Sequence, residues 1–438
     1  MIDPKMPNKV SLSLISEVFV MPEGSSTHLK GWVSSKSEIG RIVFIVLRDS
    51  SGYIQVAGKK EYMYSESFKT LKEVTIESAV AVYGNVRVDS RSPGGKEVSL
   101  SSFKCVSQAQ VWPISKSAIK SRSFLYDNRH LSIRGKKILS VMKIRAMILQ
   151  SAFQFFANEG FHLINAPTIV QSASEGGSTL FSLDYFGQPA YLTQSSQFYE
   201  EAAICGLGQV FVIQPAFRAE KSKTSKHLTE FWMIEAEKAF MDQEENMCLQ
   251  ENFLTYICNQ VADLCKNELG NLGRKFTPPK PPFIRITYDE VLDIASNQGV
   301  IIKWGEDIST EAEILISKKF QDPFFITDYP LVTRGFYHLT KPGNSKLTLS
   351  ADLIAPEGHG EIATGGQRIH DYDVLLKRIN EQSMSTESFK WYLDLRRFGM
   401  PPHSGFGIGV ERVIKWVCDQ KHIRSTSLFP RTLNRIDP

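Results

Sequence analysis

The pattern of apolar residues changes near residue 136, and this change limits the fold more than any other feature of the chain. Between about residues 27 and 110, β-branched and aromatic residues alternate with polar ones, which is typical of short strands. From Lys136, the stretch KKILSVMKIRAMILQSAFQFFANEGF repeats apolar residues at helical spacing and passes Gly160 near its end. Together with the length of 438 residues, the two patterns predict more than one domain.

The strand-rich stretch indicates a small closed sheet. Four segments carry the strand pattern, namely HLKGWVSS, GRIVFIVLRDSSGYIQVAG, ESAVAVYGNVRVD and KEVSLSSFKCVS, with turn signals at 50–52 and 92–95. About five short strands in this length favour an OB-type β-barrel. One face would carry rings and an amide beside cations: Trp32, Phe44, Tyr53 and Gln55 with Lys30, Lys36, Arg41 and Arg48. Such a face suits single-stranded nucleic acid, and the alternative is that the rings fill the barrel core.

The rest of the chain predicts a second, larger domain. Residues 113–135 are basic and irregular, and we interpret them as a hinge that follows an N-terminal domain of residues 1–112. Residues 136–438 mix strands such as QVFVIQPAFR and EFWMIEAEKAF with helical stretches such as ENMCLQENFLTYICNQVADLCKNEL. The fold class is therefore predicted as α+β, with an antiparallel sheet flanked by helices in the larger domain.

Composition narrows the class of protein. The chain is 42% apolar and 22% charged with a net charge of +4, which is typical of a globular protein and compatible with a nucleic-acid partner. Its six cysteines form no CxxC pair, so we expect reduced thiols in a cytoplasmic chain and no structural zinc. No apolar run reaches the roughly 18 residues of a membrane span, and the opening residues lack a signal-peptide cleavage site.

The segment FRAEKSKTSKHLTEF, residues 217–231, combines four kinds of group in a short space. An Arg–Glu pair is followed by a loop dense in Lys, Ser and Thr, and then by His, Glu and an aromatic ring. A solvated β-hairpin with ordinary ion pairs would account for each group taken singly. Two further segments decide between this reading and a binding site.

Those segments are a long helix followed by FHLINAPTIV, with Pro167, and the glycine-rich strand and helix GFGIGVERVIKW at 405–416. In this order, and after an N-terminal barrel, the three segments resemble the three signature motifs of class II aminoacyl-tRNA synthetases. The resemblance is to the aspartyl/asparaginyl subgroup in its archaeal-like form, and it covers essentially the whole chain.

The resemblance implies an ATP site. Arg218 would contact the α-phosphate and Arg412 the γ-phosphate, because planar, permanently charged guanidinium groups stabilise the charge of a transferring phosphoryl group. Phe231 would stack on the adenine, Glu220 would accept from its amino group, and His227 would reach the terminal phosphates. ATP presents phosphate charge, an amine and a flat ring, which explains why one segment carries all these groups. The expected ATP-binding residues are Arg218, Glu220, His227, Phe231, Glu361, Gly409 and Arg412, with Arg218, Arg412 and Glu361 as the catalytic set.

The segment DLIAPEGHGEIATGGQRIHDYD, residues 352–373, supplies the expected metal ligands. Mg²⁺ prefers hard oxygen ligands and usually takes one or two carboxylates together with substrate phosphates. By resemblance, Glu361 and Thr364 are the ligand positions, and Asp352 would assist from nearby.

The resemblance also implies a pocket for a four-carbon amino acid. Arg368 matches the arginine that bonds the substrate side-chain oxygen. The positions around the α-amino group, where an ammonium offers three donors, correspond to Glu175, Gln197 and Glu235, and Tyr337 lies in a substrate-contacting loop.

The stretch YLTQSSQFYEEAAI, residues 191–204, favours asparagine over aspartate. Aspartyl enzymes carry a Lys that pairs with the substrate carboxylate, and this chain has Glu200 there. At about 4 Å and an effective dielectric constant near 20, a like-charged pair costs roughly 4 kcal/mol. Asparaginyl enzymes commonly carry Glu at the position of Glu201, so we favour Glu201 as the group that reads the carboxamide. The alternative is that both glutamates are solvated.

For the barrel, the resemblance implies an anticodon site in which Phe44 stacks on the central uridine and Gln55 bonds its edge. The implied activity is ligation of L-asparagine to tRNA(Asn) with ATP and Mg²⁺, in a cytoplasmic homodimer that pairs through the motif containing Pro167, without membrane or DNA partners. Three alternatives stay open: an aspartyl-type ligase with relaxed tRNA choice, an asparagine-forming ligase that uses ammonia, and a non-catalytic tRNA-binding paralogue.

Overall fold

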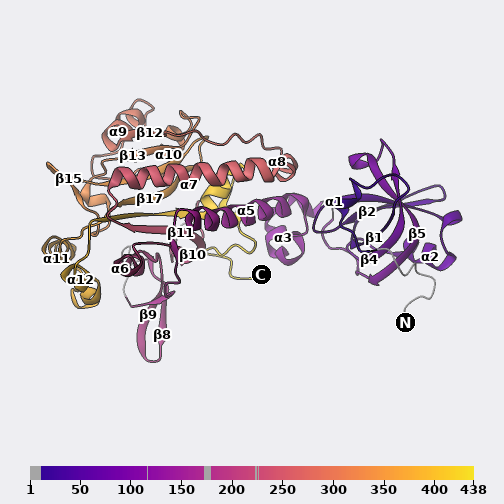
Figure 1. Cartoon of the computed structure of the whole chain (residues 1–438), viewed down its shortest axis with the longest axis horizontal. Helices are drawn as coiled ribbons and strands as arrows, with labels where there is room; N and C mark the ends of the chain where they lie inside the picture. The colour runs from indigo at the N-terminus through magenta and orange to yellow at the C-terminus, as the bar shows by residue number, and fades with distance from the viewer. Residues whose placement is uncertain (1–10, 116, 172–178, 222–223, 225) are drawn as a thin grey trace. The chain divides into compact units, whose positions relative to one another are not determined.

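The computed structural model describes residues 11–115, 117–171, 179–221, 224 and 226–438. The chain divides into two compact units, Met1–Leu125 and Tyr126–Pro438, each with its own core (Figure 1). Within the described residues, no helix is both long and apolar enough to cross a membrane.

The first unit is a closed barrel whose strands follow the order β1-β2-β3-β5-β4, which confirms the predicted OB-type barrel. Its elements are α1 (Ile15–Val18), β1 (Ser26–Ile39), β2 (Ile42–Arg48), β3 (Tyr53–Lys59), α2 (Ser65–Glu73), β4 (Ala79–Val88) and β5 (Lys96–Ser107). Alternate residues of β2 enter the core, and these are Val43, Ile45 and Leu47. Phe44 is therefore half-buried on the outer side of the barrel and does not belong to the core.

The segment between the predicted domains differs from the irregular hinge that we expected. It contains α3 (Arg122–Asp127) and α4 (Arg129–Ser132). Arg129 is almost fully buried, and its guanidinium donates to the carbonyl oxygens of Leu428 at 2.7 Å and Ser427 at 2.8 Å. These bonds hold α4 against the C-terminal part of its own unit and supply the acceptors that a buried guanidinium needs.

The second unit is built on an eight-stranded sheet in the order β12-β13-β16-β17-β18-β11-β10-β6. Most neighbouring strands are antiparallel, as predicted. The strands are β6 (His162–Leu163), β10 (Gln209–Phe217), β11 (Glu230–Ala239), β12 (Ile284–Thr287), β13 (Phe324–Thr327), β16 (Ser350–Ala355), β17 (Gly360–Gln367) and β18 (His403–Gly409). Smaller sheets contain β7 (Ile169–Val170), β8 (Ser182–Tyr185) and β9 (Gln188–Leu192), and β14 (Thr340–Lys341) and β15 (Asn344–Thr348).

Two long helices cover this sheet. They are α5 (Lys136–Asn158) and α7 (Gln243–Leu264), which run alongside one another in Figure 1 and share one hydrophobic cluster with the strands. Phe156 of α5 stacks on Phe211 of β10 with ring centroids 4.9 Å apart. The remaining helices are α6 (Gln197–Leu207), α8 (Lys266–Leu272), α9 (Tyr288–Ser296), α10 (Thr310–Ser317), α11 (Tyr372–Glu381), α12 (Lys390–Arg397) and α13 (Val410–Val417).

Candidate active site

A cavity of about 650 Å³ opens over the central strands of the large sheet. Its walls include residues of α6, β11, β17, β18 and α13, which are far apart in the sequence, together with Arg218 just beyond β10. Twelve of the predicted site residues line it: Gln197, Glu200, Arg218, His227, Phe231, Glu235, Tyr337, Glu361, Thr364, Arg368, Gly409 and Arg412. Glu175 lies outside the described residues.

Glycines of β18 make room for two carboxylates at the floor of the cavity. Gly405 is paired with Glu237 of β11, and Gly407 is paired with Glu235. A Cβ atom on Gly405 would lie 2.1 Å from the Glu237 carboxyl carbon, and one on Gly407 would lie 2.8 Å from Met233 Cε. The glycine-rich sequence of the third motif is therefore required by close approach of side chains from the neighbouring strand.

One end of the cavity gathers the predicted ATP residues. The β10–β11 hairpin places Arg218 just beyond β10, and its guanidinium lies 5.6 Å from the centre of the Phe231 ring. Glu220 does not line the cavity but lies 3.9 Å from Arg218 NH1 and 3.4 Å from His227 Nε2. Burial lowers the pKa of His227, and Arg412 and Arg218 lower it further against the opposing effect of Glu220.

The predicted metal ligands lie beside these cations. Glu361 Oε1 accepts from Arg412 NH1 at 2.5 Å and from Thr364 Oγ1 at 3.3 Å. Burial raises the pKa of Glu361, but Arg412 and the neighbouring cations more than offset it, so the pKa lies below its ordinary value. The carboxylate is therefore ionised at neutral pH and offers the hard oxygen that Mg²⁺ prefers.

Asp352 lies differently from the other two predicted ligands. Asp352 does not line the cavity, and its Oδ2 accepts from Arg334 NH2 at 2.6 Å. Its backbone is nevertheless paired with that of Thr364 on the neighbouring strand, β17. Among the described residues, no group of three or more His, Cys, Asp or Glu side chains is arranged to hold a metal ion. A magnesium ion here would thus need oxygens from the substrate phosphates as well.

The opposite end of the cavity holds a buried ion pair. Arg368 donates to Glu237 Oε1 from Nε at 2.9 Å and from NH2 at 2.5 Å, and both residues are more than nine-tenths buried. Glu237 Oε2 is buried without a hydrogen-bond partner. Burial raises the pKa of Glu237 to about 7, with Arg368 opposing the shift and Glu201 adding to it. The pair therefore leaves Glu237 Oε2 available as an acceptor beside the Arg368 guanidinium, whose position is fixed by its two hydrogen bonds.

Sequence analysis did not identify Glu237. The available signal was the spacing of Glu235 and Glu237, since residues two apart on a strand lie on the same face. With Glu235 placed in the pocket, Glu237 had to face the same cavity. Its pairing with Arg368 could not be inferred, because that residue follows 131 positions later.

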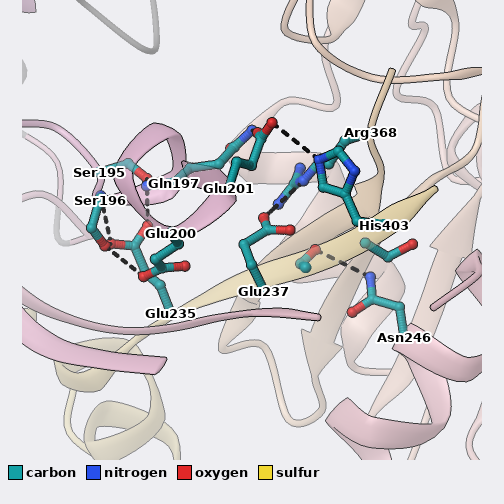
Figure 2. A network of polar contacts seen from close by, with 12 residues as sticks. Ser195, Ser196, Gln197, Glu200, Glu201, Glu235, Glu237, Asn246, Arg368 and His403 are labelled. Atoms are coloured by element: carbon teal, nitrogen blue, oxygen red, sulfur yellow. Dashed lines mark hydrogen bonds and ion pairs between the residues drawn. The ribbon is translucent and has the colours of Figure 1, made fainter. Parts of the chain in front are cut away.

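Sequence analysis favoured Glu201 as the group that reads the carboxamide, but the structure does not bring Glu201 to the lining of the cavity. Glu201 is fully buried and is not among the residues that line the cavity, whereas Glu200 is one of them. Figure 2 shows the Glu201 carboxylate directed toward His403. The Glu201 carboxylate already accepts from four donors: Gln197 Nε2 at 2.9 Å, Tyr392 OH at 2.8 Å, Arg396 NH2 at 2.5 Å and His403 Nε2 at 3.1 Å. A carboxylate with this many donors holds the side chains around it in place.

Two serines connect the remaining carboxylates of this end. Ser196 Oγ lies 2.7 Å from Glu200 Oε1 and 2.6 Å from Glu235 Oε2, and Ser195 Oγ donates to Glu235 Oε1 at 2.5 Å (Figure 2). Tyr337 closes the wall nearby, with the Arg368 guanidinium 5.5 Å from its ring centre. This end of the cavity thus brings together the carboxylates of Glu200, Glu235 and Glu237 and the guanidinium of Arg368.

In the barrel unit, the predicted anticodon residues lie on neighbouring strands. Val46 of β2 faces Gln55 of β3, and Phe44 faces Ala57, so Phe44 and Gln55 are diagonal neighbours on the outer face. The Gln55 side-chain amide donates to Ser92 Oγ at 3.0 Å and to Glu97 Oε2 at 2.8 Å. These bonds fix the orientation of the Gln55 side chain.

Comparison with known proteins gives the same picture. A family model described as tRNA synthetases class II (D, K and N) matches residues 121–433, and one described as an OB-fold nucleic acid binding domain matches residues 27–106. The asparagine–tRNA ligases of Thermococcus gammatolerans and Thermococcus kodakarensis are each 44% identical to the chain, covering 95% of it and 97% of those proteins.

Solved structures agree. The crystal structure of asparaginyl-tRNA synthetase from Pyrococcus horikoshii complexed with asparaginyl-adenylate has a TM-score of 0.95 and 40% identity, covering 98% of this chain and all of that one. The chain therefore belongs to the class II tRNA synthetases of the D, K and N group and, within it, to the family of the asparagine–tRNA ligases.

Proposed function

We propose that the chain ligates L-asparagine to tRNA(Asn) in two steps. The α-carboxylate of asparagine attacks the α-phosphorus of ATP, which gives asparaginyl-adenylate and releases pyrophosphate. A terminal ribose hydroxyl of the tRNA then attacks the carbonyl carbon and releases AMP. No side-chain nucleophile is needed, because positioning and charge stabilisation supply the catalysis. The names of the similar ligases and the adenylate in the similar structure support this proposal.

The observation that carries the choice of amino acid is the Arg368–Glu237 pair. A carboxamide has one acceptor oxygen and one NH₂ donor. Arg368 would donate to the oxygen, and Glu237 Oε2, which lacks a partner, would accept from the NH₂ group. Aspartate would place a carboxylate oxygen against the Glu237 carboxylate, which is unfavourable in a buried site.

The α-ammonium group would then lie at the wall of the cavity that contains Glu235 and Gln197, since an ammonium offers three donors. We call this wall the acidic wall because of its carboxylates. Glu175 remains a proposed contact for the same group. Glu200, which lines this wall, replaces Glu201 as a contact for the ligand, whereas Glu201 positions Gln197 through their hydrogen bond.

For ATP, we propose that the adenine lies between Phe231 and Arg412, with Glu220 accepting from its amino group and Gly409 giving backbone access. Arg218 would contact the α-phosphate at the reacting centre, and His227 the terminal phosphates. The support is that Arg218, His227, Phe231, Gly409 and Arg412 line the cavity at the end opposite the Arg368–Glu237 pair, and that Glu220 lies 3.4 Å from His227 Nε2.

A bound Mg²⁺ ion would neutralise charge on the triphosphate and orient it for attack. Glu361 and Thr364 would hold it together with phosphate oxygens, and the ionised state of Glu361 supports this role. Asp352 would contribute through its position beside Thr364.

In the barrel, Phe44 would stack on the central anticodon base and Gln55 would bond its edge, since unpaired bases are recognised in this way. We further propose a cytoplasmic homodimer that pairs through the first motif. Its support is a set of exposed apolar side chains on that motif: Phe153, Leu163 and Ile169. Replacing Leu163 with Arg should halve the molar mass measured by light scattering, whereas an unchanged mass would locate the interface elsewhere.

The test of the proposed function is amino-acid-dependent exchange of pyrophosphate into ATP, run with asparagine and with aspartate. Strong exchange with asparagine alone is expected. Exchange driven by aspartate would leave the ATP site intact but overturn the role of the Arg368–Glu237 pair. Charging of tRNA(Asn) transcripts would test the second step.

A further inference from the structure

A chain of three buried side chains lies at the same end of the cavity as the Arg368–Glu237 pair, at the acidic wall. Glu200, Ser196 and Glu235 are each no more than 5% exposed. Ser196 Oγ lies within 2.7 Å of Glu200 Oε1 and 2.6 Å of Glu235 Oε2. Both distances are short hydrogen bonds to the same hydroxyl oxygen.

Two ionised carboxylates cannot both be hydrogen-bonded to Ser196 Oγ, because this hydroxyl has only one hydrogen to donate. A serine hydroxyl donates one hydrogen, and an ionised carboxylate only accepts. One of the two bonds must therefore use a hydrogen carried by a carboxylic acid. Glu235 also accepts from the Ser196 N–H at 3.0 Å and from Ser195 Oγ at 2.5 Å. Two such donors favour the ionised form of Glu235, which assigns the hydrogen to Glu200.

The charges around Glu200 agree with this assignment. Glu235 and Glu237 face it from β11, and the nearest guanidinium, that of Arg368, already pairs with Glu237. The Arg396 guanidinium of α12 and the His403 ring of β18 both contact Glu201, not Glu200. Burial, followed by the two β11 glutamates, raises the pKa of Glu200 well above its ordinary value.

We propose that, before the amino acid binds, Glu200 and Glu235 share one proton through Ser196, and that binding of asparagine releases this proton to solvent. The inference rests on the proposed orientation, in which the α-ammonium lies at this wall. The ammonium keeps its own protons and brings a positive charge, so Glu200 ionises and its proton passes to the buffer. Because binding releases a proton from Glu200, the affinity for asparagine should increase as the pH rises from neutral.

The first test is titration calorimetry of the full-length enzyme with asparagine, in buffers that differ in ionisation enthalpy. The apparent binding enthalpy should vary linearly with the buffer enthalpy, with a slope approaching about one released proton per site. The same enthalpy in every buffer, or an affinity that does not change with pH, would overturn the proposal.

The second test assigns the proton. Glu200→Gln keeps the shape and the bond to Ser196 but removes the acid, and its binding enthalpy should not depend on the buffer. The matched control is Glu251→Gln, since Glu251 is also buried with a raised pKa but lies on α7 outside the cavity. Glu251→Gln should release as many protons as the unchanged enzyme.

A Glu200→Gln variant that still releases the proton would contradict the assignment. Should that variant fail to fold, the buffer and pH series on the unchanged enzyme still decides whether a proton is released. The failure of the proposed function looks different, because asparagine would then give no binding heat and no pyrophosphate exchange in any buffer.

Discussion

The two ends of the catalytic cavity hold their charges in different ways. At the ATP end, the side chains of Arg218 and Arg412 are 29% and 26% exposed, and their partners Glu220 and Glu361 are exposed to a similar degree. At the amino-acid end, Arg368 and Glu237 are 5% and 1% exposed and bind each other through two hydrogen bonds. The charged pairs at the first end are partly exposed to solvent, and the pair at the second end is almost fully buried.

The difference reflects the two ligands. Partly exposed cations can exchange a carboxylate partner for phosphate oxygens with little loss of solvation, and they stabilise charge that develops during phosphoryl transfer. A buried pair has a fixed geometry, so a ligand with the wrong pattern of donors and acceptors leaves polar groups unsatisfied. In the proposed function, the partly exposed end would serve catalysis and the buried end would serve selection.

The largest expected effect is at the partly exposed end. Arg218→Ala removes the cation nearest the proposed reacting centre, and asparagine-dependent pyrophosphate exchange should fall by about 10³-fold. Arg218→Lys keeps the charge but not the planar guanidinium, so its exchange rate should lie between that of the alanine variant and that of the unchanged enzyme. Exchange at a near-normal rate in the alanine variant would mean that the α-phosphate binds elsewhere.

The second effect is at the buried end. Glu237→Gln replaces the unpartnered acceptor and removes one charge of the buried pair, so kcat/KM for asparagine should fall by about 10²-fold. Selection against aspartate should weaken in the same variant, as measured by exchange with each amino acid. Glu251→Gln serves as the control for loss of a buried carboxylate outside the cavity. An unchanged preference for asparagine would contradict the role of Glu237.

The third effect is a pH dependence of selection. The pKa of Glu237 is raised to about 7, so the neutral acid gains population as the pH falls below that value. A neutral acid can donate to a carboxylate of aspartate, whereas the ionised form repels it. The ratio of kcat/KM for asparagine to that for aspartate should therefore decrease as the pH is lowered through 7. This trend should disappear in Glu237→Gln.

The smallest expected effect comes from a substitution in the barrel, which should change the KM for tRNA and leave the reaction in the cavity unchanged. Phe44→Ala removes one proposed stacking contact, so the KM for tRNA in aminoacylation should rise about tenfold. Pyrophosphate exchange should not change, because exchange does not use tRNA. Tyr62→Ala removes an exposed ring that lies outside the barrel strands and should leave both reactions unchanged. A fall in exchange with Phe44→Ala would show that the barrel influences activation.

Local sequence patterns were sufficient to predict the barrel and the end of the cavity formed by the β10–β11 hairpin. The barrel follows from alternation along each strand, and the ATP end follows from one hairpin, in which Ala216 faces Phe231 and Arg218 comes directly after β10. Residues brought together by a hairpin are close in sequence, so their motif can be recognised without knowledge of the tertiary fold.

Only the tertiary structure decided the amino-acid end. Glu200 and Glu201 are adjacent on α6, and successive helical residues point about 100° apart, so the sequence could not show which one faces the cavity. Three of the four partners of Glu201 lie 191 to 202 residues further along the chain, and Glu237 meets Arg368 across 131 residues. Such contacts depend on how strands and helices pack, because burial and pairing are properties of the assembled core.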